Sequence, residues 1–188
     1  MPSGKFSLPT ILSFKFYAVN PTKSHGSVSC PAWLFPLGNS GIECVPVSTE
    51  GDFPGFVSKE RIAQFDRAEA VLGILLEHLG RRVALFPGAS RVRPDWPQIL
   101  RTCEVVFFDG TFWSDDELIR LQGNGKSARQ MGHQPVEDTL CALADIEARK
   151  IFIHINNTNP MLDEDSEEFR RVRDAGWEIA CDGMDLIV

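Results

Sequence analysis

Two apolar runs in this 188-residue chain each end on a side chain capable of acid–base or metal chemistry. Residues 105–108 (VVFF) lead directly into Asp109, and residues 151–153 (IFI) lead directly into His154. A third such group, His133, lies between the two runs. In layered α/β folds, a rigid sheet holds side chains at the ends of its strands, and binding sites are often built there. We therefore expect the three side chains to converge at one rim of a sheet.

A carboxylate combined with neutral imidazoles is a ligand set that suits Zn(II) or non-haem Fe(II). Such a set activates water at zinc, and with open coordination positions it binds O₂ at iron. Asp109 and His154 are the candidate metal ligands, and His133 is the candidate catalytic group. His133 lies just before an expected helix N-terminus, where the helix dipole favours the neutral imidazole.

Each of these residues also has a plainer structural explanation. His154 could be a hydrogen-bonded histidine of the core, and His133 could be a loop or capping residue. Asp109 could cap a turn at Gly110, or it could support a metal site from behind the ligands.

Four polar residues near these positions are candidates for substrate binding: Asn156, Asn157, Lys126 and Arg129. The asparagines follow His154 directly, and the alternative is that they hold its loop through backbone hydrogen bonds. Lys126 and Arg129 belong to a glycine-containing loop, and the alternative for them is a solvated surface. Near a site, their positive charge would attract an acidic substrate.

The elements that must position these residues form an α/β pattern, with helices covering a sheet. Strands are expected at 42–47, 105–108 and 151–153, and 48–65 is expected to be a loop. Residues 68–79 fit either a helix or a strand, and we favour a strand hairpin with 83–86. A second hairpin is expected over 177–188, with Asp182-Gly183 as its turn.

Four helices are expected between or after these strands. The first covers 97–101, and the second begins at Ser114 as N-cap, followed by acidic residues. The third begins at Pro135 and ends near 149–150, with an apolar stripe of Val136, Leu140, Leu143 and Ile146. The fourth begins at Ser166 and stops at Gly176.

Composition excludes several classes of protein. The net charge of −7 argues against non-specific nucleic-acid binding, which needs a basic face. The sequence has no apolar run near the roughly 20 residues of a membrane span, and we read no secretory signal at its start. The five cysteines are scattered without a CxxC pair, which predicts reduced thiols in the cytoplasm.

Four motifs resemble the PqqB family of pyrroloquinoline quinone (PQQ) biosynthesis proteins, which belongs to the metallo-β-lactamase superfamily. They are 108–113 (FDGTFW), 131–133 (MGH), 153–160 (IHINNTNP) and the ending 176–184. The 154–160 motif is long and specific, and the order and spacing of the motifs also fit. The resemblance extends from about residue 42 to residue 188.

The resemblance implies a four-layer αβ/βα sandwich of which this chain is the C-terminal half. Residues 41–188 would form that half-domain, and 1–40 would be a poorly defined N-terminal segment. In PqqB-like proteins the first half carries a cysteine-rich zinc knuckle and an Asp/His metal motif, and this sequence has neither. The chain also has Gly88-Ala89-Ser90 where many hydrolases of the superfamily place a bridging aspartate, which weakens a hydrolase interpretation. A fragment, a truncated gene product or a degenerate paralogue would fit this pattern.

The resemblance also implies two alternative functions. The first is metal-dependent hydroxylation of the tyrosine part of the glutamate–tyrosine precursor of PQQ, with Fe(II) or Zn(II) as cofactor. The second is a non-catalytic carrier that assists transport of PQQ to the periplasm, or an inactive half-domain. Expected partners are the peptide-derived precursor, other PQQ biosynthesis proteins, and either a second copy of the chain or a first-half partner.

Overall fold

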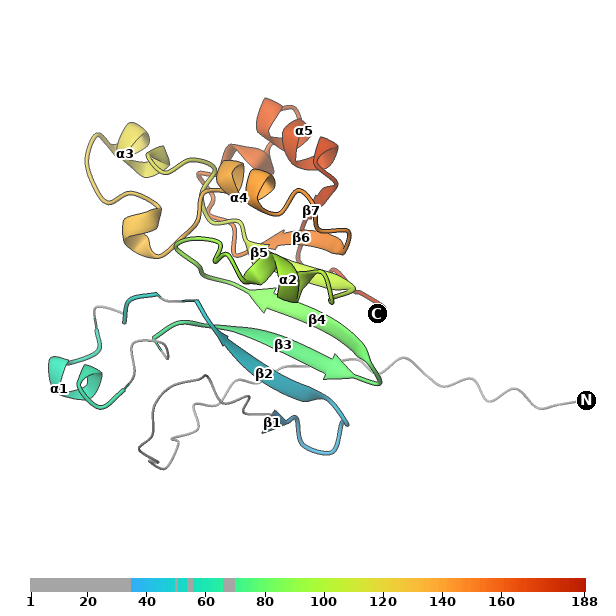
Figure 1. Ribbon diagram of the computed structural model, residues 1–188. Coiled ribbons are helices and arrows are strands. Elements are labelled where there is room, and N and C mark those ends of the chain that lie inside the picture. Colours follow the sequence, from blue (N-terminus) through green and yellow to red (C-terminus); the bar gives the residue numbers. More distant parts are fainter. Residues whose placement is uncertain (1–34, 50, 54–55, 66–69) are drawn as a thin grey trace, which may run out of the picture.

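The computed structural model describes residues 35–49, 51–53, 56–65 and 70–188. Within this part, seven strands form one sheet whose spatial order follows the chain (Figure 1). Strands β1 to β4 pair antiparallel and strands β4 to β7 pair parallel. The strands are β1 (Phe35–Pro36), β2 (Glu43–Ser48), β3 (Leu72–His78), β4 (Arg81–Phe86), β5 (Val105–Asp109), β6 (Arg149–Ile153) and β7 (Trp177–Ile179).

The expected strands at 42–47, 105–108 and 151–153 are confirmed as β2, β5 and β6. The ambiguous stretch at 68–79 contains β3, which forms a hairpin with β4 as favoured from the sequence. Leu79 and Gly80 join the two strands with φ values of 51° and 78°. A two-residue type I′ turn needs positive φ at both positions, so this connection fixes the register of the hairpin. Of the segment expected to be poorly defined, residues 1–34 lie outside the described residues.

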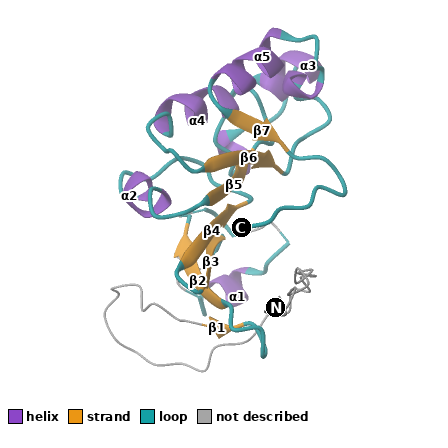
Figure 2. Ribbon diagram, turned by 90° about the vertical axis from the view of Figure 1, so that its right-hand side faces the viewer, coloured by secondary structure: helices purple, strands orange, loops and turns teal. Residues whose placement is uncertain are grey.

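Short helices connect the strands. They are α1 (Lys59–Ile62), α2 (Trp96–Leu100), α3 (Glu117–Gln122), α4 (Val136–Ala142) and α5 (Glu167–Asp174), with 3-10 turns η2 (Arg129–Met131) and η3 (Pro160–Leu162). Figure 2 shows α2 and α4 on one side of the sheet. Helix α5 begins as expected, because the Ser166 hydroxyl accepts a hydrogen bond from the Phe169 N–H. In the described part, no helix is long and apolar enough to cross a membrane.

The core lies between the sheet and these helices. Its largest buried side chains are aromatic: Phe86, Trp96, Phe108, Phe152 and Trp177. The rings of Phe152 and Trp177 stack at a centroid distance of 4.1 Å, which joins β6 to β7. The predicted apolar stripe of α4 is buried along its whole length, including Leu143 and Ile146 just beyond the end of the helix.

The opposite face of the sheet also carries apolar side chains. Leu85 pairs with Phe107 across β4 and β5, so the two residues point to the same face, and both are half-buried. Asp109 lies two residues beyond Phe107 and therefore points to this face as well. The candidate site thus belongs to the side of the sheet that α2 and α4 do not cover.

Three sequence-based expectations about helix ends and loops are wrong. Helix α3 begins at Glu117, because the Ser114 hydroxyl bonds Asp116 and Arg120 side chains instead of capping the helix. Helix α4 ends at Ala142, and residues 149–150 already belong to β6. The stretch 48–65, expected to be a loop, contains α1.

The C-terminal hairpin does not form either. The turn at Asp182-Gly183 exists, with a Met184 N–H to Cys181 carbonyl hydrogen bond of 3.1 Å and a positive φ at Gly183. Residues 184–188, however, form no strand. The chain leaves the sheet after Ala180 and ends beside β4 in both ribbon views, so it does not return along β7 (Figures 1 and 2).

Candidate metal centre

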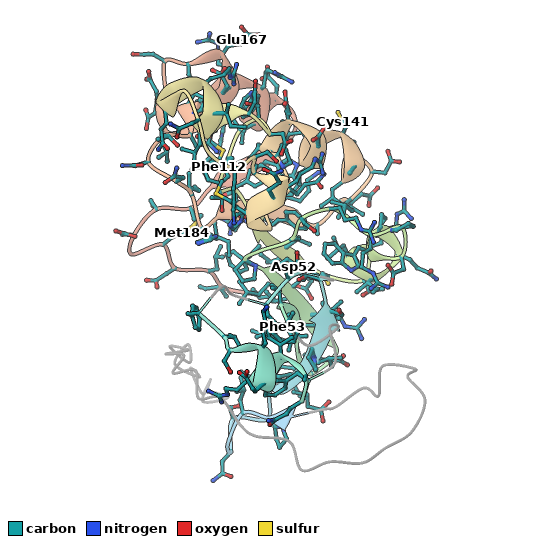
Figure 3. The ribbon with its side chains drawn as sticks, turned by 90° about the vertical axis from the view of Figure 1, so that its left-hand side faces the viewer. Asp52, Phe53, Phe112, Cys141, Glu167 and Met184 are labelled. Atoms are coloured by element: carbon teal, nitrogen blue, oxygen red, sulfur yellow. The ribbon has the colours of Figure 1, made fainter. Side chains whose placement is uncertain are left out.

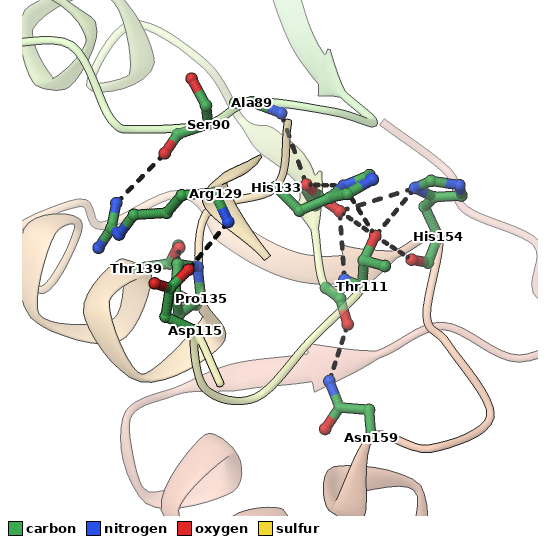
Figure 4. Close-up of polar contacts among 12 residues, drawn as sticks. Ala89, Ser90, Thr111, Asp115, Arg129, His133, Pro135, Thr139, His154 and Asn159 are labelled. Carbon is green, nitrogen blue, oxygen red and sulfur yellow. Dashed lines mark hydrogen bonds and ion pairs between the residues drawn. The ribbon is translucent and has the colours of Figure 1, made fainter. Parts of the chain in front are cut away.

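Asp109, His133 and His154 converge at the rim of the sheet, as predicted. Figure 4 shows His133 and His154 beside Thr111. One potential ligand atom from each residue lies within 4.8 Å of those of the other two. The Asp109 Oδ2 atom is 2.7 Å from His133 Nδ1, and its Oδ1 atom is 3.7 Å from His154 Nδ1. The imidazole rings of the two histidines have centroids 5.3 Å apart.

Two strand ends bring Asp109 and His154 together. Asp109 is the last residue of β5 and pairs with Ile153, the last residue of β6, directly before His154. The next residue, Gly110, has no room for a side chain, because an added Cβ would lie 2.9 Å from atoms of Phe152 and Met161. Glycine at this position therefore allows the ends of the two strands to approach closely.

His133 comes from a loop that is fastened from several directions. Asp115 accepts hydrogen bonds at 2.9 Å from the N–H groups of Ala128 and Arg129, through its carbonyl and its carboxylate. Gly132, with φ 91°, then turns the chain before His133, whose N–H donates to the Ala128 carbonyl. Phe112, labelled in Figure 3, packs edge-on against the His133 ring at a centroid distance of 5.8 Å.

Asp109 is fully buried, yet it is held as a carboxylate. Burial raises its pKa, but the neighbouring imidazoles of His133 and His154 lower it by more, so the pKa lies below its ordinary value. The Thr111 N–H also donates to Asp109 Oδ1 at 3.1 Å. Asp109 therefore caps the local turn, as the structural alternative proposed, and presents a negative charge to both imidazoles.

His154 is exposed, so the alternative of a core histidine is wrong for this residue. Its φ is 55°, in the left-handed region that costs a non-glycine residue on the order of 1–3 kcal/mol. Asp109 raises the pKa of the His154 imidazole, and partial burial opposes that increase. Strained backbone of this kind persists only where surrounding contacts hold it, and it is concentrated at functional sites.

The asparagines of the 154–160 motif organise their own loop. Asn156 donates to the Thr158 hydroxyl at 2.6 Å, and Asn159 donates to the Gly110 carbonyl at 2.9 Å. Asn157 is exposed. These contacts agree with the loop-holding alternative for Asn156, and substrate binding by Asn156 and Asn157 stays a prediction.

The two basic candidates differ in their surroundings. Lys126 is exposed in the loop that follows α3. Arg129 pairs with Asp138 and also donates to the carbonyl of Ser90 at 3.2 Å and to the side chain of Gln134 at 3.1 Å. These bonds tie the loop of His133 to the turn after β4, so Arg129 has a clear structural task. The Ala89 N–H of that turn approaches Asp109 Oδ2 at 3.5 Å. The turn, which has no carboxylate of its own, therefore contributes a backbone N–H to the site.

Two further residues of the site were not anticipated from the sequence. Thr111 lies between the three candidate ligands. Glu117, read as a first-turn acid of a helix, is buried and accepts hydrogen bonds from the Trp113 N–H and the Thr158 hydroxyl. Thr111 lies in the 108–113 motif and Glu117 lies shortly after it. Nearness to this motif is the one feature of the sequence that could have indicated their part in the site.

The donor set fits a metal ion. Two imidazoles and one ionised carboxylate match the three-ligand sets of catalytic zinc and non-haem iron sites. A hollow of about 390 Å³ lies beside the exposed His154, which leaves that side of the group accessible. Its lining residues are Ile153, His154, Ile155, Leu162, Ala180, Cys181 and Asp182.

The chain matches a known superfamily of proteins. Residues 13–155 match the model of the beta-lactamase superfamily domain, and this match includes Asp109, His133 and His154. The chain therefore belongs to the beta-lactamase superfamily. The α/β sheet with its site at the strand ends agrees with that assignment.

Within this superfamily, the chain is similar to Coenzyme PQQ synthesis protein B, or PqqB. It is 38% identical to the protein of Xanthomonas oryzae pv. oryzae (strain MAFF 311018) over 156 residues, which cover 80% of this chain and 52% of the relative. It is 43% identical to the protein of Methylobacterium nodulans over 122 residues, which cover 63% of this chain and 41% of the relative. The resemblance to PqqB predicted from the motifs is confirmed.

A solved structure gives the same result. The crystal structure of Zn(2+)-bound PqqB from Methylobacterium extorquens superimposes with a TM-score of 0.69 at 34% sequence identity. The similarity covers 79% of this chain and 51% of that chain. The chain thus spans about half the length of the PqqB proteins that it matches.

Proposed function

We propose that this chain acts in PQQ biosynthesis as a PqqB-type protein with a metal centre at Asp109, His133 and His154. The observation that carries the proposal is the convergence of these three side chains within a region similar to PqqB. The Zn(2+)-bound relative supports a metal at such a centre, and the ligand types suit Fe(II) as well as Zn(II).

Each residue has a distinct task in this proposal. Asp109 supplies the buried negative charge, as a ligand or as the partner that orients the imidazoles. His154 faces the accessible side as a ligand. His133, hydrogen-bonded to Asp109, completes the ligand set; its alternative role, the one expected from the sequence, is to take up or deliver a proton beside a metal held by Asp109 and His154. When bound, Fe(II) would supply O₂ activation, and Zn(II) would supply an activated water.

The proposed reaction is hydroxylation of the tyrosine part of the Glu-Tyr precursor of PQQ. It would insert one oxygen atom of O₂ into a ring C–H bond. Two electrons and two protons from an external reductant would convert the other oxygen atom to water. Asn156, Asn157, Lys126 and Arg129 are the proposed substrate contacts, and the basic pair would attract the glutamate carboxylate. We place the chain in the cytoplasm with the other PQQ biosynthesis proteins.

The alternative is a carrier that binds PQQ and assists its transport without catalysis, or an inactive half-domain. A substrate cleft needs two walls, and this chain spans about half the length of its relatives. We therefore expect weak metal binding and low activity from the chain alone. A homo-oligomer or a first-half partner would complete the walls.

Metal titration distinguishes these functions. The chain is purified anaerobically and loaded with Fe(II) or Zn(II), and retained metal is measured after desalting, together with oxidation of the tyrosine precursor. We expect weak binding that falls further, by about 10-fold or more, in the Asp109→Asn and His154→Ala variants. The matched control is His78→Ala, because His78 is an exposed histidine that bonds the Gly41 carbonyl away from the centre.

Metal binding that is unchanged in Asp109→Asn and His154→Ala would refute the proposed centre. Stoichiometric, His154-dependent metal with turnover would instead show that this chain alone is a sufficient enzyme. Tight binding of PQQ in the presence of a chelator, without turnover, would favour the carrier.

A further inference from the structure

Thr111 is in contact with every member of the proposed metal centre. Its hydroxyl lies 2.5 Å from Asp109 Oδ1, 3.1 Å from His133 Nδ1 and 3.0 Å from His154 Nδ1 (Figure 4). The same hydroxyl lies 2.8 Å from the His154 carbonyl oxygen. Thr111 itself is 7% exposed, so solvent does not compete effectively for these contacts.

A hydroxyl has one proton to donate and two lone pairs to accept with. Asp109 is the charged acceptor and the nearest one, so it takes the proton. The lone pairs then face the Nδ1 atoms of His133 and His154, and they accept from whichever of these atoms carries a proton. His133 Nδ1 additionally reaches Asp109 Oδ2 at 2.7 Å, whereas His154 Nδ1 is 3.7 Å from Asp109. Thr111 is therefore the closer anchor for the His154 ring.

The backbone of Thr111 holds the same turn. Its carbonyl accepts the Asn156 N–H at 3.1 Å, two residues beyond His154. His154 needs such support because its φ of 55° is unfavourable for a side chain with a Cβ. The ring and main chain of His154 are thus fixed by one buried residue on the neighbouring strand end.

We propose that Thr111 is a positioning residue of the metal centre, whose hydroxyl sets the orientation of the His154 imidazole relative to Asp109 and His133. This proposal rests on the metal centre proposed above. Residues that orient metal ligands in this way typically contribute about 10- to 100-fold to metal affinity.

The test compares Thr111→Val, which keeps the shape and removes the hydroxyl, with Thr111→Ser, which keeps the hydroxyl. Thr111→Ala replaces the valine variant if that variant does not fold. Thr139→Val is the matched control, because Thr139 is a buried threonine of α4 whose hydroxyl, among the contacts described, bonds only the carbonyl of Pro135, the residue before the helix. Co(II) serves as the metal probe, since its visible spectrum reports ligand geometry. The second readout is the ¹⁵N resonance pair of the His154 imidazole in the metal-free protein.

We expect Thr111→Val to weaken Co(II) binding about 10- to 100-fold, to change the Co(II) spectrum, and to shift the His154 Nδ1 resonance. Thr111→Ser should restore all three, and Thr139→Val should leave them unchanged. Parental affinity, spectrum and resonances in Thr111→Val would overturn the proposal, as would equal losses in Thr139→Val. If the parent binds no Co(II), the proposed function fails, and the imidazole resonances of the metal-free variants still decide the role of Thr111.

Discussion

At the residue scale, His154 contributes little to the stability of the fold, although its side chain belongs to the candidate site. Its side chain is exposed and buries little surface. Its backbone is in the left-handed region, where only glycine is free of a steric cost. The positive φ of His154 therefore costs stability, as expected if this residue serves the proposed site.

Substitutions at His154 measure this cost. We expect His154→Gly to be more stable than His154→Ala by about 1 kcal/mol, because glycine adopts positive φ without strain. Urea denaturation gives the two free energies of unfolding. The control is the same pair at exposed Asn157, which lacks a positive φ, where glycine should be the less stable. An alanine variant as stable as the glycine variant at position 154 would contradict the argument.

At the element scale, the site depends on a clamp between α3 and the loop that follows β6. Glu117 opens α3, and its buried carboxylate accepts from the Trp113 N–H at 2.6 Å and from the Thr158 hydroxyl at 2.5 Å. Thr158 in turn accepts from Asn156. The carboxylate thus connects the 108–113 motif with the 154–160 motif, which lie far apart in the sequence.

Removing this clamp should destabilise the protein. We expect Glu117→Ala to cost about 1–3 kcal/mol, because a buried N–H and a hydroxyl lose their partner. In this variant, amide hydrogen exchange in residues 154–160 should accelerate relative to the parent protein, and it should accelerate more there than in β3 and β4. Glu164→Ala is the control, since Glu164 is exposed and should change stability little. An unchanged exchange rate in the 154–160 loop would show that the clamp does not hold it.

At the scale of the whole molecule, the sheet has one face covered by α2 and α4 and another with half-buried apolar side chains. The second face includes Ile74, Leu76, Val83, Leu85 and Phe107. The resemblance to an αβ/βα sandwich predicts that a second layer covers such a face, and this chain spans about half of the PqqB proteins. Half-buried apolar side chains gathered on one sheet face favour association with a second layer.

We therefore expect the isolated chain to be oligomeric or marginally stable. Sedimentation equilibrium should show association that increases with concentration and decreases in Leu85→Lys. Leu121→Lys is the matched control, because Leu121 is an exposed leucine on α3. A monomeric parent that unfolds cooperatively at high stability would argue against the half-domain interpretation.

The sequence was most informative where strand and site coincide. The apolar runs before Asp109 and His154 identify buried strands, and parallel neighbouring strands bring their last residues to one rim, so this convergence was predictable. The start of α5 was predictable for a similar reason, because the Ser166 cap acts within one turn of the chain.

Features that depend on distant contacts were not predictable from one sequence. Thr111 and Glu117 have ordinary local roles as turn and first-turn residues, and only the fold brings His154 and Thr158 to them. Ser114 looked like a helix cap, but its hydroxyl bonds neighbouring side chains instead. The Asp182-Gly183 turn formed without its hairpin, because a turn signal does not decide where the following segment packs.

The order of the sheet has a consequence for how the chain acquires its structure. Every pair of adjacent strands in the described sheet is also consecutive along the polypeptide, from β1 to β7. Strands pair in the order in which they are synthesised, so the sheet can extend strand by strand, and its longest wait is for residues 110–148 to bring β6 to β5. During synthesis, β2 leaves the ribosome before the β3–β4 hairpin with which it pairs, and β5 and β6 can add to the free edge of β4 as they emerge. The proposed metal centre then assembles only after β6, because it requires the residue that follows this strand.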